Sequence, residues 1–302
     1  MKYLFLNPQS CSGLALKKWS KVKTLLPELS EAIIVDDFYQ IDWNLFQIAE
    51  GDSFISAGGD GTLHCMVNAL VKNKGIEILL MIKIGHIGLG SNNSFLRPYS
   101  ECQIISDIPM RISDLTYAQD LMEIEVLNGQ STEHLYCVAN SSIGFLATAN
   151  ILFNTSSDIA ILKKWNSDLA DVYTFIKALI MWKPIKIRYE IDQKSESRMI
   201  TNMHFMKKPY YATDLGFPEV IDPANGRFRL NVLWERNPIT ILRKFFSMLV
   251  FKNLLQGRDM SAEIDQINIS CDKAIPIEMD GEIYYGTDFK IKTYKEGIRL
   301  CK

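Results

Sequence analysis

The chain has no surplus of positive charge and no long apolar run. Lysine and arginine together number 33 against 35 acidic residues, a formal net charge of −2, so no overall positive field attracts nucleic acid and we expect no nucleic-acid partner. Apolar stretches such as 245–251 are far shorter than the roughly 20 residues that cross a bilayer. The start of the chain does not resemble a signal peptide. These absences predict a cytoplasmic protein, with peripheral contact at the inner membrane surface left open.

Metal-binding cysteine patterns are absent as well. The six cysteines are scattered, without a CxxC pair and without a Cys/His spacing that suits zinc. Low-complexity tracts and internal repeats are also missing. Hydrophobic residues make up 47% and charged residues 23% of the 302 positions, which is the composition of a globular protein long enough for two domains.

The first third of the chain alternates strand-like and helix-like segments. Short apolar runs bounded by turn residues predict buried strands at 3–6, 32–35, 54–57 and 78–84. Apolar residues at helical spacing predict helices over 14–26 and 62–72. Strand and helix in alternation indicate a parallel sheet that is covered on both faces.

The pattern changes near residue 118 to the two-residue period of antiparallel strands. Segment 121–127 alternates apolar and polar residues, and Asn128-Gly129 predicts a hairpin turn into 134–140. The same period recurs at 185–191, 228–234 and 264–270, with helical segments at 158–182 and 238–256. We therefore predict a Rossmann-like α/β nucleotide-binding domain over 1–118, with 294–302 returning to it, and a mostly β substrate-binding domain over 119–293, an antiparallel β-sandwich.

The strongest local signal is the glycine-rich turn at residues 58–62. An apolar strand runs into Gly58, Gly59, Asp60, Gly61 and Thr62, and a helix follows. Glycines let a ligand approach the main chain, and free N–H groups at a helix start suit a phosphate. Asp60 is suited to position Mg²⁺ or to order the loop. The alternative is an ordinary strand–turn–helix connection.

Four segments together resemble the diacylglycerol/sphingosine-type lipid kinases. Residues 58–62 match the GGDGT signature, which NAD kinases share. Residues 7–13 resemble the family's Asn-Pro…Ser-Gly loop, and residues 89–97 its LGTGNDFAR motif. Residues 279–282 resemble its DGE motif, and 140–149 the segment that enters the second domain. The order and spacing fit across nearly the whole chain.

The resemblance implies an ATP- and Mg²⁺-dependent kinase of phospholipid biosynthesis. It assigns nucleotide binding to Asn7, Pro8, Ser12, Gly13, Gly58, Gly59, Gly61, Thr62, Ser91 and Asn93. It assigns catalysis to Asp60 and to the carboxylates of Asp280 and Glu282, which accept the proton of a lipid hydroxyl. In an extended segment Asp280 and Glu282 would share one side; the alternative is a plain Asp-Gly hairpin turn. Lys17 and Lys18 are either phosphate contacts or solvated helix residues.

Three positions depart from the family pattern. Ser94 stands where the family has an acidic residue, with Asn92 in place of a glycine. Asn225 stands for an aspartate associated with a structural Mg²⁺, and Asp222 is the candidate substitute ligand.

The sequence leaves two other functions open: NAD kinase, and a catalytically impaired nucleotide- or lipid-binding relative. The apolar segment 238–257, edged by basic residues, is either a lipid-facing element or a helix packed on the β domain. The expected partners are a nucleotide, a lipid substrate at a membrane surface and a second copy of the chain in a homodimer.

Overall fold

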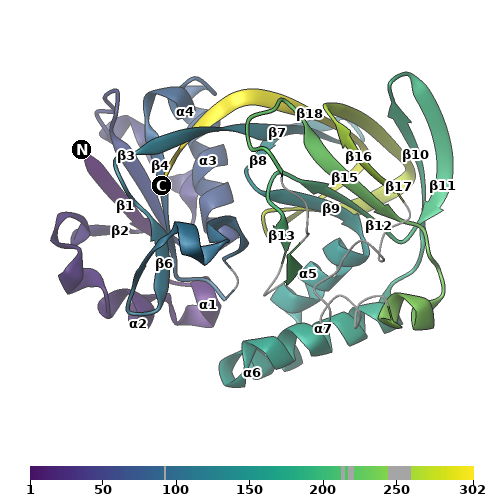
Figure 1. Cartoon of the computed structure of the whole chain (residues 1–302), viewed down its shortest axis with the longest axis horizontal. Coiled ribbons are helices and arrows are strands. Elements are labelled where there is room, and N and C mark those ends of the chain that lie inside the picture. Colours follow the sequence, from purple (N-terminus) through teal and green to yellow (C-terminus); the bar gives the residue numbers. More distant parts are fainter. Residues whose placement is uncertain (92, 212–214, 217–220, 244–259) are drawn as a thin grey trace. The chain divides into compact units, whose positions relative to one another are not determined.

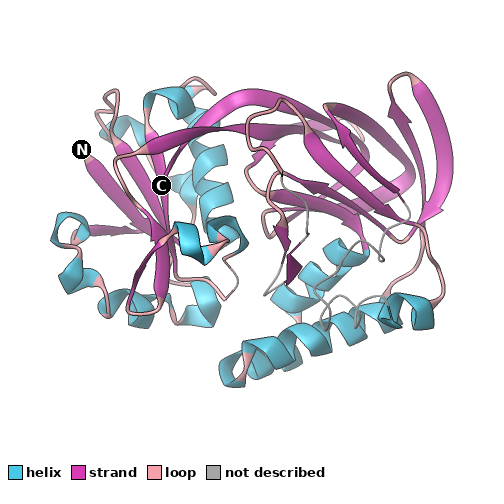
Figure 2. Ribbon diagram, viewed as in Figure 1, coloured by secondary structure: helices cyan, strands magenta, loops and turns pink. Residues whose placement is uncertain are grey.

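The computed structural model describes residues 1–91, 93–211, 215–216, 221–243 and 260–302 (Figures 1 and 2). The chain forms two compact units. The first contains Met1–Asp120 and Lys295–Lys302, and the second contains Leu121–Tyr294. The chain passes between the units within two strands, β7 (Thr116–Asn128) and β18 (Glu282–Cys301).

A parallel sheet forms the centre of the first unit. Its strands are β1 (Lys2–Leu6), β2 (Ala32–Ile34), β3 (Ser53–Gly58) and β4 (Lys83–Gly88), in the order β2-β1-β3-β4. Leu300 of β18 pairs in parallel with Ile84 of β4. The antiparallel strand β6 (Ile108–Arg111) also pairs with β4, and β5 (Gln103–Ile105) pairs with β6. Strands β1, β3 and β4 are almost fully buried because both sheet faces are covered, as the apolar runs predicted.

Helices connect these strands, with one change from the prediction. The long helix α3 (Asp60–Lys74) follows β3, and the short helices α1 (Ser10–Gly13) and α2 (Ala15–Ser20) follow β1. The predicted strand 78–84 was wrong at its start: Ile78–Met81 is the helix α4, and β4 begins only at Lys83. A short apolar run does not distinguish a buried helix turn from a strand. The predicted helix 14–26 likewise ends at Ser20, and 3₁₀ turns follow at Lys23–Leu25 and Pro27–Leu29.

Antiparallel strands dominate the second unit. β7 and β8 (Ser131–Cys137) form the predicted hairpin around Asn128-Gly129. β10 (Ile185–Ile191) forms a second hairpin with β11 (Lys194–Ile200). The other strands are β9 (Asn140–Gly144), β12 (Asn202–Met206), β13 (Tyr210–Tyr211), β14 (Leu215–Gly216), β15 (Phe228–Leu233), β16 (Met260–Ile264) and β17 (Gln266–Met279). The buried faces of these strands enclose an apolar core that includes Ile124, Phe205, Leu230, Ile277 and Phe289. The predicted fold class, parallel α/β followed by antiparallel β, is confirmed.

Three helices, α5 (Phe145–Thr155), α6 (Ser157–Trp165) and α7 (Ser167–Met181), belong to the second unit. α5 packs against β9 and β17, and all three helices contact one another. Residues 238–243 are helical, whereas the rest of the predicted 238–257 segment lies outside the described residues up to Met260. Among the described helices, no single one is long and apolar enough to cross a membrane; the bent pair of α5 and α6 meets the length and composition criteria jointly.

Candidate active site

Three loops meet at the carboxyl ends of β1, β3 and β4 in the first unit. Asn7 ends β1 and donates from Nδ2 to the Thr62 hydroxyl over 3.4 Å. The Ser10 hydroxyl lies 3.1 Å from the same Thr62 oxygen. The main-chain N–H groups of Leu89 and Gly90 both donate to the carbonyl of Gly58 at 2.8 Å. The predicted nucleotide loops 7–13, 58–62 and 89–93 therefore lie together, at the edge where parallel sheets bind ligands.

Close approach of neighbouring atoms requires glycine at two of these positions. A Cβ on Gly58 would lie 2.1 Å from the Thr62 hydroxyl oxygen, and one on Gly90 would lie 2.5 Å from the Cα of Gly59. Gly59 is the residue before the first turn of α3. Backbone N–H groups at the start of α3 are thus left uncovered by side chains, which is the arrangement that accommodates a phosphate.

The loop after β1 is not the simple helix start that its sequence indicated. Cys11, Ser12 and Gly13 have φ angles of 55°, 54° and 84°, all in the left-handed region, before α2 begins at Ala15. Non-glycine residues adopt this conformation at a cost, and such residues concentrate at ligand sites. Ser12 and Gly13 are exposed, as is Gln9 before them. Strained, exposed backbone at this position fits a binding loop better than a plain connection.

Asp60 orders the neighbouring loop. Its carboxylate oxygens accept the main-chain N–H groups of Ser94, at 2.9 Å, and Phe95, at 3.2 Å. Of the two roles foreseen for this residue, the contacts fit loop ordering rather than direct ligation of Mg²⁺. The serine that replaces the family's acidic residue, Ser94, is buried and meets Asp60 through its backbone. Serine at position 94 therefore places no second carboxylate next to Asp60.

Ser91 and Asn93 lie at the same group of loops. Asn93 is only 6% exposed and donates from Nδ2 to the Gly88 carbonyl, while its Oδ1 has no hydrogen-bond partner among the described residues. The Ser91 hydroxyl lies 3.7 Å from the Cys11 sulfur. Lys18 donates from Nζ to the Gly90 carbonyl at 2.8 Å, whereas Lys17 is exposed. A buried, unpaired amide oxygen beside a glycine cradle is an acceptor open to a ligand donor.

Asp280 lies in the second unit, in the two-residue turn between β17 and β18. Asp280 and Gly281 have φ angles of 49° and 97°, and Met279 pairs with Glu282 across them. The expectation of an extended segment here is wrong, because Asp-Gly adopts the left-handed turn that joins antiparallel strands. Glu282 begins β18 and is partly exposed. The Asp-Gly-Glu sequence is therefore a hairpin turn, although an unusually anchored one.

The anchor is a set of backbone amides that no local sequence pattern reveals. The Asp280 carboxylate is 6% exposed and accepts N–H groups of Val138 (2.7 Å), Ala139 (2.8 Å) and Asn140 (3.1 Å). The Cys137 thiol lies 3.3 Å from Oδ1. Burial, together with the nearby carboxylates of Asp280 and Glu278, raises the pKa of that thiol well above its usual range. Three main-chain N–H donors hold the Asp280 side chain in one orientation.

Glu278 is a second buried acid at this turn that the sequence did not indicate. It is 2% exposed, and its Oε1 accepts the Gly281 N–H at 2.7 Å while Oε2 accepts the Ser142 hydroxyl at 2.8 Å. Glu278 and Asp280 lie two positions apart, a spacing that is common in ordinary strands. No sequence pattern would therefore have singled out Glu278. The hydrogen bond from the Gly281 N–H anchors that end of the turn to Glu278.

The side chains of Asp222 and Asn225 cap the turn at residues 222–227. Asp222 Oδ1 accepts the Ala224 N–H, and Asn225 Oδ1 accepts the Arg227 N–H. Lys207, only 1% exposed, donates from Nζ to the Arg227 carbonyl at 2.7 Å. The role of Asp222 as a Mg²⁺ ligand stays a prediction.

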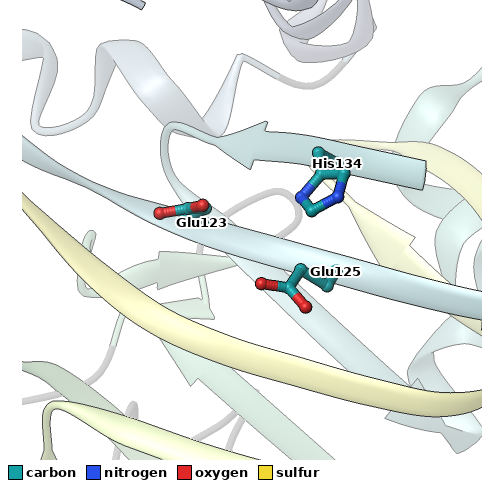
Figure 3. A group of neighbouring side chains, drawn as sticks. All are labelled: Glu123, Glu125 and His134. Atoms are coloured by element: carbon teal, nitrogen blue, oxygen red, sulfur yellow. The ribbon is translucent and has the colours of Figure 1, made fainter. Parts of the chain in front are cut away.

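One mixed group, Glu123, Glu125 and His134, has ligand atoms within 4.8 Å of one another (Figure 3). Both glutamates already form ion pairs, Glu123 with Lys292 at 3.1 Å and Glu125 with Lys290 at 3.5 Å. The group is therefore a charge-balanced outer face of β7, β8 and β18 rather than a metal centre.

Comparisons with known proteins agree with this arrangement. Residues 2–124 match the family model described as the diacylglycerol kinase catalytic domain. A "putative lipid kinase" of Staphylococcus carnosus (strain TM300) is 24% identical over 256 residues, which cover 82% of this chain and 76% of that protein. Two crystal structures of proteins from Bacillus anthracis str. Sterne, described as a "putative diacylglycerol kinase" and "a diacylglycerol kinases", each superpose on this chain with a TM-score of 0.66. Their identities are 15% and 14%, and they cover 99% of this chain and 94% and 96% of their own chains.

Proposed function

Since residues 2–124 match the family model of the diacylglycerol kinase catalytic domain, we propose that this chain transfers the γ-phosphoryl group of ATP to the hydroxyl of a lipid. The observation that carries the proposal is the glycine cradle of Gly58, Gly59 and Gly90, where a side chain at either of two positions would collide with its neighbours. This cradle lies at the carboxyl ends of β3 and β4, together with the strained loop after β1.

The chain's own groups supply the nucleotide contacts. Backbone N–H groups at the start of α3 and the hydroxyls of Ser10 and Thr62 face the cradle as donors for phosphate oxygens. The unpaired Oδ1 of Asn93 accepts a hydrogen bond from the nucleotide. Asp60 keeps residues 94 and 95 in place. ATP supplies the phosphoryl group, and Mg²⁺ enters as its counterion, because nucleotide-bound Mg²⁺ is held largely by phosphates and water.

The turn 280–282 supplies the proton acceptor. Three main-chain N–H groups hold the Asp280 side chain in place, and Glu282, two residues further along, offers a partly exposed side chain. Phosphoryl transfer passes through a loose transition state, so the lipid hydroxyl loses its proton late and a carboxylate is basic enough to take it. Support for a lipid acceptor comes from the family of the first unit and from the name of the Staphylococcus relative.

An acceptor competition tests the proposal. Purified protein receives labelled ATP with diacylglycerol and sphingoid bases dispersed in detergent, or with NAD. Label in the organic phase is the expected result. Label in NADP would assign the protein to the NAD kinases, and nucleotide binding without transfer to any acceptor would mark a catalytically impaired relative.

Asp60→Ala is the matched variant for this assay. It removes the acceptor of two loop N–H groups, so we expect transfer to be abolished while the far-ultraviolet circular dichroism stays that of the wild type. Asp42→Ala, which removes an exposed acidic cap of a 3₁₀ turn in the same unit, is the control. Wild-type turnover in Asp60→Ala would show that the loop does not need this carboxylate.

A further inference from the structure

The helices α6 and α7 carry an exposed apolar surface, which we call the α6–α7 face. It consists of Ile161, Trp165, Leu169, Tyr173, Ile176 and Ile180. Figure 1 shows the two helices running along one side of the second unit, away from its strands. Single exposed apolar residues are ordinary, but a continuous set of this size on adjacent helices marks an interaction surface.

The spacing of these residues shows that they share a face. On α7 the exposed positions 169, 173, 176 and 180 follow the i, i+4, i+7, i+11 pattern of a single helix stripe. On α6 the positions 161 and 165 are four apart. Trp165 is 88% exposed and Ile180 is 79% exposed, which are extreme values for large apolar side chains in a folded domain.

The opposite sides of the same helices already have their own core. Ile159, Ala170 and Ala178 are fully buried and pack with Leu152 and Trp182. A helix that is apolar on both sides needs a second apolar environment in addition to the core of its own domain. The exposed stripe is therefore not the core side of α7.

Charged groups flank this apolar surface. Asp158 forms an ion pair with Lys177 at 2.7 Å and accepts the Tyr173 hydroxyl at 2.9 Å, so its charge is compensated. Directly after α7, the described side chains of Lys183, Lys186 and Arg188 are exposed. An apolar stripe that ends in cations is complementary to a lipid surface with anionic headgroups.

We propose that the α6–α7 face is a membrane-docking surface, which inserts its apolar side chains among the lipids of an anionic bilayer. The choice of lipid as the occupant rests partly on the proposed function, because a lipid acceptor resides in a bilayer. Trp165 and Tyr173 carry the amphipathic rings that favour the headgroup region. A second copy of the chain is the other candidate occupant, and the assays below distinguish it from a bilayer.

Vesicle cosedimentation of the whole protein tests the surface directly. Vesicles of phosphatidylcholine, with or without phosphatidylglycerol, are compared for the wild type and the triple variant Trp165→Ser/Leu169→Ser/Ile180→Ser. We expect the wild type to bind the anionic vesicles and the triple variant to bind them at least about tenfold more weakly, because each lost apolar side chain removes buried area. The control Leu45→Ser/Leu115→Ser changes side chains that are 80% and 70% exposed in the first unit and should bind as the wild type does.

Two further measurements separate the contributions. Lys183→Glu/Lys186→Glu should remove the preference for phosphatidylglycerol, whereas Lys194→Glu, at an exposed hairpin end, should keep it. Fluorescence should shift to the blue on binding, and Trp165→Phe should abolish most of that shift, because Trp19, Trp43 and Trp182 are at least 92% buried and Trp234 is partly buried against the β core.

Failure of this proposal differs from failure of the proposed function. If the protein transfers phosphate to no acceptor but the triple variant still loses vesicle binding, the docking surface stands alone. If the triple variant binds vesicles as the wild type does, the docking proposal is overturned, whatever the kinase assay shows. Absence of wild-type vesicle binding, combined with a dimer that the triple variant converts to a monomer, would also overturn it and assign the face to self-association.

Discussion

Asp280 illustrates how one side chain combines a structural and a chemical role. Its carboxylate accepts hydrogen bonds from three successive main-chain N–H groups, those of residues 138, 139 and 140. Unsatisfied buried donors are costly, so the acid holds together two segments that lie about 140 positions apart. Chemistry at this turn therefore cannot be separated from stability by changing Asp280 alone.

The variants Asp280→Asn and Glu282→Gln should resolve the two roles. Asp280→Asn places a side-chain NH2 group against main-chain N–H donors, so it should lower the free energy of unfolding by about 1–3 kcal/mol. Glu282→Gln should leave the urea midpoint unchanged. If Glu282 accepts the proton, its variant should reduce kcat by about 10²–10⁴-fold. Wild-type kcat in Glu282→Gln, with a low kcat in folded Asp280→Asn, would assign the proton to Asp280.

His86 makes stability depend on pH. It is fully buried with its Nδ1 2.7 Å from the Ser56 hydroxyl, and burial lowers its pKa to about 4 from 6.5. The unfolded chain therefore binds a proton between pH 6.5 and about 4 that the folded state excludes. Stability should be complete above pH 6.5 and fall as the pH drops through this window, by on the order of 3 kcal/mol.

Urea midpoints at pH 7.5 and pH 5 measure this effect. His86→Asn keeps an acceptor for Ser56 and should make the midpoint less sensitive to pH. The exposed His134, changed to Asn, is the control and should leave the sensitivity unchanged. Because burial also lowers the pKa of His204 to about 3, part of the pH dependence should persist in His86→Asn. An unaltered difference between the two midpoints in His86→Asn would contradict this origin.

At the scale of elements, the strand–turn–helix unit β3–α3 was readable from sequence because its signals are local. Gly58 to Thr62 follow an apolar strand and precede a helical pattern, and all lie within ten residues. The short helix α4 was not readable, because four apolar residues fit either secondary structure. Contacts between distant loops, such as Asp60 with residues 94 and 95, depend on how strands order themselves in the sheet, which periodicity does not encode.

Gly90→Ala tests the meeting of two such elements. Its Cβ would lie 2.5 Å from the Gly59 Cα, a main-chain atom that cannot rotate away. The loop must shift at a cost of about 1–3 kcal/mol, so calorimetry should show ATP binding weakened by tenfold or more. Ser100→Ala, an exposed change farther along the same connection, should bind ATP normally. Equal affinities would mean that the cradle tolerates a side chain.

At the scale of the whole molecule, the last residues of the chain belong to the first unit. Ile298 and Leu300 are fully buried, and Leu300 pairs with Ile84 of β4. A parallel pairing across more than 200 positions leaves no mark on local composition.

Leu300→Ala should therefore destabilise the first unit selectively. Loss of a buried leucine costs about 2–5 kcal/mol, so hydrogen exchange should speed up at the amides of β4 and much less at those of β12. Arg299→Ala, at the exposed neighbouring position, should leave both rates unchanged. Equal acceleration in both strands would indicate that the two units unfold together.

The return of β18 also has a consequence for the order in which the protein is made. Residues 295–302 leave the ribosome after all of residues 121–294, so the second unit is available to fold while the sheet of the first unit still lacks Leu300. The glycine cradle belongs to the first unit, whose sheet is still incomplete at that point. A nascent chain should accordingly acquire nucleotide binding only after residues 295–302 have left the ribosome.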